Sequence, residues 1–257
     1  MSSNPGDAID TTVVIMAFDE VVTLPAVTEE IEEVLASLGR PYDILIVDDG
    51  SRDGTGASAD ELAAKGERIR VVHHQVNGGL GGVYRTGFRE ATGRYVTFFP
   101  ADGQFPASII AAFRPAMESA DLVLGYLPDR RDSLLGKALS WIERLLYRTL
   151  LGPMPRFQGI MMFRRALLDT VPLASVGRGW GVVMEFIIRV SRSDAVVVSR
   201  PTTIRPRTTG VSKVNNTRTI LANLKQLLDL RAVLRNDDVQ READSPHARR
   251  SESGGAR

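Results

Sequence analysis

Acidic residues follow three stretches rich in β-branched and aromatic residues, at the points where buried strands are expected to end. The stretches are "TVVIMAF", "YDILIV" and "RYVTFFP", and the residues after them include Asp19, Glu20, Asp48, Asp49 and Asp102. In an open parallel sheet the carboxyl ends of the strands share one edge, where ligands bind. Clustered carboxylates repel one another, and a divalent cation held together with substrate phosphates relieves that repulsion. Asp and Gly also favour turns after strands, so a purely structural role stays open.

Two other segments contain groups that suit phosphate binding. The segment "NGGLGGVYRTG" (77–87) has glycines ahead of a predicted helix, where backbone amides can approach a phosphate or a sugar. It matches neither the dinucleotide fingerprint nor the P-loop, and a flexible turn explains it equally well. The segment "IRPRTTGVSK" (204–213) combines Arg205, Arg207 and Lys213 with hydroxyl side chains. Such a loop either binds phosphate through its arginines and hydroxyls or is simply a solvated basic loop.

The overall composition excludes several classes of protein. The 257 residues include 32 Lys and Arg and 31 Asp and Glu, so the net charge of +1 gives no reason to expect a nucleic-acid partner. The absence of cysteine excludes disulfides, thiolate metal sites and a cysteine nucleophile. The N-terminal residues lack the pattern of a signal peptide, and no run of about 18 apolar residues is present. We therefore expect a cytoplasmic protein, either soluble or attached peripherally at the inner face of the membrane.

The hydrophobic pattern alternates between strand-like and helix-like segments. Strands are predicted at 12–18, 42–51, 68–74, 94–104 and 120–126, and helices at 25–39, 56–66, 79–93 and 106–118. This alternation predicts an α/β fold, with a mostly parallel, Rossmann-like sheet and helices on both faces. A polar tail is predicted at 1–10, one nucleotide-binding domain at 11–235, and a disordered tail at 236–257, where large apolar residues are almost lacking.

Two longer amphipathic helices are predicted at 134–151 and 217–235. The first has a wide apolar face in which Lys137, Arg144 and Arg148 are interspersed. That combination suits a helix that lies among lipid headgroups. It also suits a core helix or a dimer helix, and the second helix has the same ambiguity. A membrane surface and a second copy of the chain, in a homo-oligomer, are therefore both candidate partners.

The motifs, taken in order, resemble those of the inverting nucleotide-sugar glycosyltransferases of family two, especially the polyprenyl-phosphate sugar synthases of the dolichyl-phosphate mannose type. The matching stretches are "VVIMAFDE", "ILIVDDGSRDGT", "NGGLGGVYRTGF", "GRYVTFFPADGQFP", "LGYLPDRRDSLLGKALS", "FQGIMMFRR" and "RPRTTGVSK", within residues 12 to about 232. The resemblance implies the GT-A fold, a single nucleotide-binding α/β domain. It also implies transfer of a sugar, with inversion, from a UDP- or GDP-sugar to an acceptor, most often a polyprenyl phosphate, with Mg²⁺ or Mn²⁺ as cofactor.

The same resemblance implies roles for individual residues. The nucleotide sugar would be bound by Ala17, Glu20, Asp48, Asp49, Arg85, Ala101 and Asp102. The metal ion would be held by Asp102 and Gln104, and the catalytic residues would be Asp102, Arg207 and Lys213. The acceptor or its phosphate would be bound by Lys137, Ser140, Arg207, Ser212 and Lys213.

Several departures from the family pattern leave alternatives open. Pro100 replaces the first Asp of the family's Asp-x-Asp, and Asp19 replaces the usual Asn of the first turn. A soluble acceptor with a hydroxyl group is one alternative, and it would require a general base such as Asp102 or Glu185. Glu185 is alternatively the structural partner of a buried arginine. A non-catalytic nucleotide-sugar binder is a further alternative. A nucleotidyltransferase is disfavoured, because "AFDEVVTLPA" lacks the basic group expected after the first strand of that class.

Overall fold

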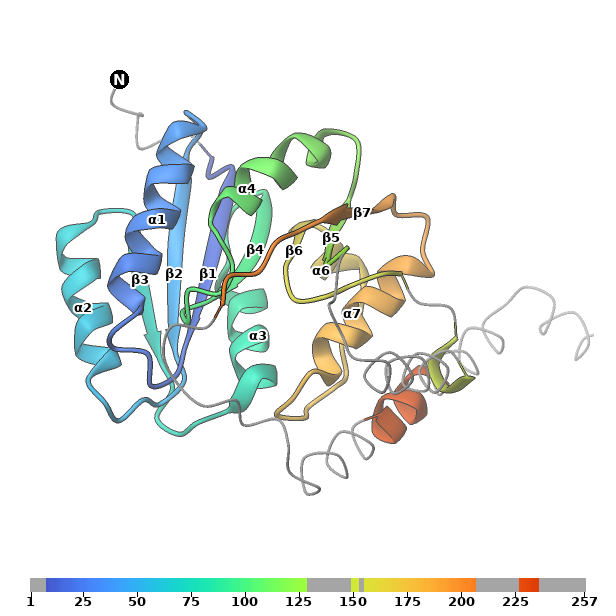
Figure 1. The fold of residues 1–257 in the computed structure, drawn as a ribbon. Coiled ribbons are helices and arrows are strands. Elements are labelled where there is room, and N and C mark those ends of the chain that lie inside the picture. Colours follow the sequence, from blue (N-terminus) through green and yellow to red (C-terminus); the bar gives the residue numbers. More distant parts are fainter. Residues whose placement is uncertain (1–7, 129–148, 153–154, 207–226, 236–257) are drawn as a thin grey trace, which may run out of the picture.

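The computed structural model describes residues 8–128, 149–152, 155–206 and 227–235, and these form one seven-stranded sheet with helices on both faces (Figure 1). The strand order is β3-β2-β1-β4-β6-β5-β7. The strands are β1 (Thr11–Ala17), β2 (Tyr42–Asp48), β3 (Ile69–His73), β4 (Tyr95–Pro100), β5 (Leu122–Tyr126), β6 (Met161–Arg164) and β7 (Val197–Pro201). Only β6 runs against its neighbours in this sheet, because it pairs antiparallel with both β4 and β5.

The helices cover the sheet in two layers, each with its own hydrophobic core. They are α1 (Leu24–Ser37), α2 (Thr55–Lys65), α3 (Gly79–Glu90), α4 (Ser108–Phe113), α6 (Leu167–Thr170) and α7 (Gly181–Ser191), with a 3₁₀ helix, η1 (Arg114–Glu118). Val13 and Ile15 of β1 pack with α1, α2 and α4, whereas Val14 packs with α3 and α7 on the other face. This alternation follows from the two-residue period of a strand. Because both faces are covered, every residue of β2 is buried.

The expected fold class is confirmed, but the sequence did not predict two of the strands. The patterns gave five strands, and both β6 and β7 went unrecognised. At four residues, β6 is too short to show a period that separates a strand from a buried helical turn. It lies between β4 and β5 and runs antiparallel to both, so the sheet is mixed. The order of strands along the chain would instead place β5 parallel beside β4.

The predicted C-terminal amphipathic helix is described only in its last part. Residues 227–235 are helical, and Leu227, Leu230 and Leu234 pack against Leu151 and Ile188. Residues 217–226 and most of the predicted helix at 134–151 lie outside the described residues. Within the described ranges, no helix has both the length and the apolar character required to cross a lipid bilayer.

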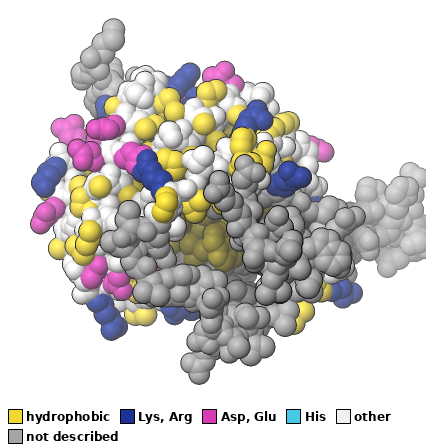
Figure 2. All heavy atoms as spheres, viewed as in Figure 1, with side chains coloured by type: hydrophobic (Ala, Val, Ile, Leu, Met, Phe, Trp, Pro, Cys, Tyr) yellow, Lys and Arg dark blue, Asp and Glu magenta, His cyan; other side chains and the backbone are white. Residues whose placement is uncertain are grey.

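Charges of both signs are mixed on the surface. Figure 2 shows Lys and Arg side chains interspersed with Asp and Glu over the described part of one face, without a large area of a single sign. This distribution agrees with the net charge of +1. On the described part of this face, no area of a single sign is present that would attract a charged partner as a whole.

Candidate functional site

The three acidic strand ends lie at one edge of the sheet, as the sequence predicted. In the strand register Ala17 pairs with Asp48, and Met16 pairs with Pro100. The backbone N–H of Asp49 donates to the carbonyl of Ala17 at 2.9 Å, so the polar residues after β1 and β2 start from adjacent positions. β4 is the other neighbour of β1, and Asp102 follows two residues after its end. A shared acidic edge is therefore a property of the fold.

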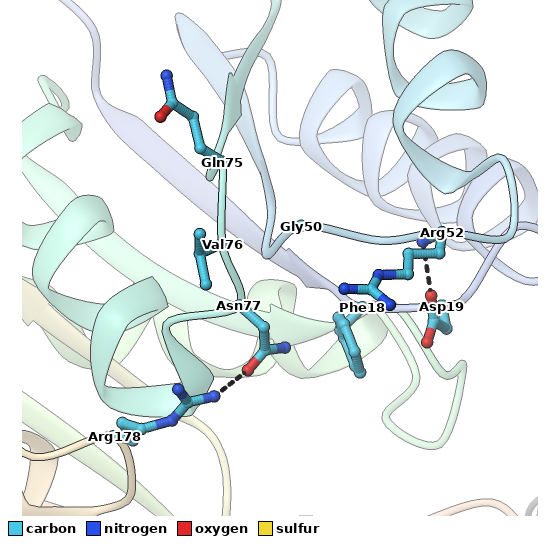
Figure 3. A pocket seen from close by; sticks show the side chains of 8 residues that line it. All are labelled: Phe18, Asp19, Gly50, Arg52, Gln75, Val76, Asn77 and Arg178. Carbon is cyan, nitrogen blue, oxygen red and sulfur yellow. Dashed lines mark hydrogen bonds between the residues drawn. The ribbon is translucent and has the colours of Figure 1, made fainter.

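A hollow of about 380 Å³ opens at this edge. It is lined by Phe18, Asp19, Gly50, Arg52, Gln75, Val76, Asn77 and Arg178 (Figure 3). Figure 3 shows Phe18, Asp19 and Arg52 on one side and Gln75, Val76, Asn77 and Arg178 on the other. The guanidinium of Arg178 donates to Asn77 Oδ1 at 2.6 Å, so the second side combines segments 101 residues apart. The hollow thus joins an aromatic ring with amide, guanidinium and carboxylate groups, a combination that suits a nucleobase.

The turn after β1 has an unusual backbone conformation at Asp19. Its φ of 55° is the only positive value at a non-glycine residue in the part of the chain that the structure describes. Two hydrogen bonds hold it there: the N–H of Asp19 donates to Ser51 Oγ at 3.0 Å, and the N–H of Arg52 donates to Asp19 Oδ1 at 2.9 Å. Strained backbone of this kind persists where surrounding contacts fix it. Here it brings Asp19 and Arg52 together at the wall of the hollow.

Asp48 and Asp49 are each paired with a histidine at the end of β3. Asp48 Oδ2 lies 3.0 Å from His73 Nδ1, and the other ring nitrogen of His73 lies 3.0 Å from Asp60. Asp49 Oδ1 lies 2.6 Å from His74 Nδ1, and it also accepts the N–H of Gly78 at 2.7 Å. Both carboxylates are almost completely buried, with exposed fractions of 5% and 3%. The two aspartates are therefore fixed in orientation.

The electrostatics of the Asp48–His73 pair favour its charged form. Burial raises the pKa of Asp48, but the hydrogen bonds from Ser51 and His73 outweigh it and hold the pKa below its usual range. The hydrogen bond with Asp48, and then the one with Asp60, raise the pKa of His73. His73 lies between the carboxylates of Asp48 and Asp60. When its ring is protonated, the three groups together have a smaller net negative charge than the two carboxylates alone. This lowers the electrostatic cost of placing an anionic ligand at the edge.

Asp102 lies in a tight turn directly after β4. Its Oδ1 accepts the N–H of Gln104 at 3.1 Å, and Gly103 between them has a φ of +71°, which favours glycine. The N–H of Ala101 donates to Met16 in β1 at 2.9 Å, which fixes the start of the turn. The carboxylate and the Gln104 amide are oxygen ligands of the kind that Mg²⁺ and Mn²⁺ accept. No group of three or more His, Asp and Glu side chains suited to a metal occurs among the described residues.

The segment before α7 packs onto the N-terminal end of α3 and brings Arg178 to the hollow. The N–H of Gly81 donates to the carbonyl of Arg178 at 2.8 Å, and a Cβ on Gly81 would lie 2.2 Å from the carbonyl of Gly177. The N–H groups of Gly78 and Gly79 donate to Asp49 and Asn77. The glycines of 77–87 thus allow close packing of backbone, and three of their amides have acceptors within the protein. The interpretation of these amides as anion ligands is accordingly not supported.

Arg85 and Glu185 hold the same segment in place. Arg85 Nη1 donates to the carbonyls of Gly177 at 2.8 Å and Ser175 at 3.4 Å. Its predicted contact with the nucleotide stays a prediction, and the described contacts give it a role in fixing this segment. Glu185 is completely buried and accepts hydrogen bonds from the N–H groups of Ala174 and Ser175 and from Arg189. These contacts agree with the structural alternative, in which Glu185 is the partner of a buried arginine, Arg189; the general-base alternative stays a prediction.

The remaining predicted site residues fall into two groups. Ala17 and Ala101 are buried at the ends of their strands, and the N–H of Glu20 donates to Thr55 Oγ1 at 2.8 Å. The residues predicted to bind the acceptor or its phosphate lie outside the described residues; they are Lys137, Ser140, Arg207, Ser212 and Lys213. Arg178 and Arg52 were not predicted. A strand-end pattern could have indicated Arg52, but no local signal links Arg178 to this edge.

Comparison with known proteins identifies the family. The model of the family described as Glycosyl transferase family 2 matches residues 12–171, which is more than half of the chain. An undecaprenyl-phosphate mannosyltransferase from Micrococcus luteus is 30% identical over 212 residues, covering 76% of this chain and 87% of that protein. A polyprenol monophosphomannose synthase from Mycolicibacterium smegmatis is 30% identical over 220 residues, covering 80% of this chain and 81% of that protein.

Solved structures share the fold. A glucosyl-3-phosphoglycerate synthase from Mycobacterium tuberculosis, crystallised with Mn²⁺, UDP and phosphoglyceric acid, has a TM-score of 0.61 at 19% identity, covering 85% of this chain and 78% of that chain. A mannosyl-3-phosphoglycerate synthase from Rubrobacter xylanophilus has a TM-score of 0.63 at 16% identity, covering 93% and 77%. At these identities the likeness establishes the GT-A fold alone. Together with the family match, it shows that the chain belongs to glycosyltransferase family 2 and is a glycosyltransferase.

Proposed function

We propose that the protein transfers a hexose from a UDP- or GDP-sugar to a polyprenyl phosphate, with inversion at the anomeric carbon. One observation above all supports the proposal: a hollow of about 380 Å³ opens beside the acidic strand ends of the sheet. Two relatives at 30% identity have names that specify undecaprenyl-phosphate mannosyl transfer and polyprenol monophosphomannose synthesis. These names support a polyprenyl phosphate as the acceptor.

The nucleoside end of the donor is proposed to occupy the hollow. Phe18, which is 39% exposed, offers an aromatic face for the base. Asn77 and Arg178 offer amide and guanidinium groups to the base edge or the ribose. The family resemblance assigns the base and the ribose to Asp48 and Asp49, with Ala17, Glu20 and Ala101; both aspartates are buried behind the residues that line the hollow. The pairing of both aspartates with histidines supports this role, because it fixes the direction of each carboxylate.

Asp102 and Gln104 are proposed to hold Mg²⁺ or Mn²⁺ against the diphosphate of the donor. One carboxylate and one amide oxygen, completed by donor phosphates and water, make an oxygen ligand set that suits either ion. When bound, the ion would neutralise charge that develops on the departing diphosphate. Because Pro100 replaces a second carboxylate, we expect tight metal binding only when the nucleotide is also bound.

A phosphate acceptor needs no strong general base, because its second pKa of about 6 leaves it ionised at neutral pH. One of its oxygens attacks the anomeric carbon while the bond from that carbon to the diphosphate oxygen breaks. The nucleoside diphosphate leaves with the electron pair, and attack from the opposite face inverts the configuration. Positioning and charge screening are then the main tasks of the protein. The family resemblance assigns them to Arg207 and Lys213, with Lys137, Ser140 and Ser212 on the acceptor side; all five lie outside the described residues.

The reaction is proposed to take place at a membrane surface, since the tail of a polyprenyl phosphate lies in the bilayer. A thermal-shift screen of UDP- and GDP-sugars with and without Mn²⁺ tests the donor, because a ligand that binds only the folded state raises its Tm. Transfer to a polyprenyl phosphate in vesicles, measured together with co-sedimentation, tests the acceptor and the location. Donor binding without transfer to any acceptor would favour the non-catalytic alternative.

Substitution of Asp102 tests the metal-binding role directly. We expect Asp102→Ala to lower the transfer rate by about 100-fold or more, because Lewis-acid stabilisation is worth several kcal/mol. The Tm of the ligand-free protein should change little, since Asp102 is only partly buried and accepts the N–H of Gln104 within its own turn. Asp169→Ala is the control, because that side chain is 65% exposed in α6. Transfer by Asp102→Ala at the wild-type rate would contradict the proposed role.

A further inference from the structure

An ion pair between two residues far apart in the sequence lies beside the turn that contains Asp102. It links α1 to the segment after β7. Glu30 lies in α1, and Arg205 lies four residues after β7. Their side chains form two parallel hydrogen bonds, Nη1 to Oε2 at 2.7 Å and Nη2 to Oε1 at 2.8 Å. Figure 1 shows that the segment after β7 leaves that edge strand and crosses in front of the sheet toward β4 and β1. The ion pair anchors that crossing segment on α1.

Arg205 also binds the backbone of the turn that contains Asp102, and Glu30 binds the backbone just after that turn, at the start of α4. The N–H of Arg205 donates to the carbonyl of Gln104 at 2.7 Å. Glu30 Oε1 accepts the N–H of Ala107 at 3.0 Å. The N–H of Gln104 in turn donates to Asp102 Oδ1 at 3.1 Å. The backbone of Gln104 is therefore held at both of its polar groups, because its carbonyl accepts from Arg205 and its N–H donates to Asp102. Displacement of Arg205 would move this backbone and so reorient the Asp102 carboxylate.

The geometry of this pair is more specific than that of an ordinary surface ion pair. The side chains of Glu30 and Arg205 are 32% and 48% exposed, and exposed pairs generally contribute little to stability. A bidentate arrangement adds directional constraint as well as attraction. The hydrogen bond with Arg205 is the main cause that lowers the pKa of Glu30, so the pair stays charged under neutral conditions. Its main effect is therefore expected on the position of the turn, with a smaller effect on stability.

We propose that Glu30 and Arg205 are positioning residues that hold the Asp102–Gln104 turn in the orientation required for metal-dependent binding of the nucleotide diphosphate. The fixed positions on either side of the turn support this assignment. Ala101 is fixed on β1 through the carbonyl of Met16, and Ala107 is fixed on α1 through Glu30. The inference rests on the proposed function, because it requires Asp102 to contribute to the metal site.

The test measures how tightly Mn²⁺ binds in the presence of UDP or GDP, whichever raises the Tm of the wild-type protein more. Glu30→Gln removes the charge but keeps a side-chain oxygen for Ala107, and Arg205→Lys keeps the charge but loses the paired geometry. We expect each variant to need about 10-fold more Mn²⁺ for half of the full thermal shift, a difference of about 1.4 kcal/mol. The Tm without ligands and the affinity for nucleotide without metal should stay close to the wild-type values.

Two further variants make the result specific. The exchange Glu30→Arg with Arg205→Glu should restore part of the Mn²⁺ affinity that either single exchange loses. Glu33→Gln is the matched control, because Glu33 lies in the same helix on an exposed position. Wild-type Mn²⁺ affinity in Glu30→Gln and Arg205→Lys would overturn the inference. A fall in ligand-free Tm that accounts for the whole loss, or an equal loss in Glu33→Gln, would also overturn it.

The Asp102→Ala variant separates failure of the inference from failure of the proposed function. If Asp102→Ala loses the Mn²⁺-dependent thermal shift while Glu30→Gln retains it, Asp102 contributes to the metal site and only the positioning role is wrong. If Asp102→Ala retains the full Mn²⁺-dependent shift, the metal role of Asp102 is itself wrong, and the positioning role falls with it.

Discussion

His73 and His74 are adjacent in the chain, yet each contacts a different buried carboxylate at the end of β2. His73 bridges Asp48 and Asp60, and His74 bridges Asp49 and Thr86. Side chains of successive residues leave a strand in opposite directions, so one histidine pair can orient two neighbouring aspartates differently. The aspartates that are proposed to bind the nucleoside thus depend on two histidines for their orientation.

The Asp48–His73 pair makes stability depend on pH in a defined direction. The pKa of His73 is raised in the folded protein, so its contribution is complete below the unfolded value of about 6.5 and is lost as pH rises through the folded value. Asp48, whose pKa is lowered, stays ionised throughout that range. The stabilisation from the pair should therefore be larger at about pH 6 than at about pH 9.

We predict that His73→Gln removes this dependence. The difference in free energy of unfolding between the wild-type protein and the variant should be no more than about 1 kcal/mol at about pH 6, because the His73 side chain is 41% exposed and solvent screens its charge. It should shrink towards about pH 9. Urea unfolding of both proteins over this range measures the difference, and a difference that does not change with pH would contradict the prediction.

Sequence patterns located the acidic residues of the site but not all of their surroundings. Asp48, Asp49 and Asp102 follow strongly apolar strands, and such strands are recognisable because both of their faces are buried. Arg178 lies 101 residues from Asn77, and its contact depends on the packing of a connecting segment on α3. Nothing in the local sequence specifies that packing. The position of Arg178 therefore had to come from the three-dimensional structure.

At the scale of elements, the order of helices and strands was predictable as far as β5. Each of the strands β1 to β4 is followed by a helix with an apolar face, and the alternation of the two periods identifies both. After residue 128 the order changes, because β6 returns to pair between β4 and β5. The return depends on contacts distant in sequence: the N–H of Arg164 donates to Asp121, and the N–H of Gly125 donates to Ile160. A four-residue strand has too little pattern to predict this arrangement.

The contact between α3 and the segment before α7 requires the absence of a side chain at Gly81. We predict that Gly81→Ala lowers the free energy of unfolding by about 1 to 3 kcal/mol, the usual range for overpacking. Alanine would otherwise favour a helix over glycine by up to about 1 kcal/mol, so the expected sign is opposite to that of helix propensity. The reason is the distance of 2.2 Å from the added Cβ to the carbonyl of Gly177.

The same variant should weaken donor binding, because displacement of this segment also moves Arg178 from Asn77. Urea unfolding and the thermal shift caused by the nucleotide measure the two effects. Gly177→Ala is the matched control: a Cβ there would meet nothing within 4 Å, so both quantities should stay near the wild-type values. A stable Gly81→Ala variant with unchanged nucleotide binding would show that the segment tolerates the extra carbon.

At the scale of the whole molecule, the two ends of the sheet have different tasks. The carboxyl ends provide the hollow and the acidic edge, whereas the amino ends contain a buried ion pair. Arg114, in η1, forms two hydrogen bonds of 2.8 Å with Asp10, just before β1. Its guanidinium also lies 4.4 Å from the ring centre of Tyr95 at the start of β4. This cluster ties the layer of α4 and η1 to the central strands without reaching the site.

We predict that Arg114→Ala lowers the free energy of unfolding at neutral pH by about 2 to 4 kcal/mol, because it leaves the Asp10 carboxylate with only the Thr11 hydroxyl and the more distant Arg40. The Arg114 side chain is only 6% exposed, so water cannot easily replace it. Burial raises the pKa of Asp10, but the hydrogen bonds from Arg114 and Thr11 outweigh it and lower the pKa. The stabilisation is therefore present above the unfolded pKa of about 3.8 and is lost as pH falls through the folded value.

Denaturant unfolding at neutral pH and at successively lower pH measures both the loss and its decline in acid. Arg165→Ala is the control, since that side chain is 42% exposed and lies 3.9 Å from Asp169; it should change the free energy of unfolding by less than about 1 kcal/mol. Because the Asp10–Arg114 cluster lies at the amino ends of the strands, the folded Arg114→Ala protein should bind nucleotide sugar with wild-type affinity. A loss of nucleotide affinity as large as that in Gly81→Ala would show that the two ends of the sheet are coupled, contrary to this division of tasks.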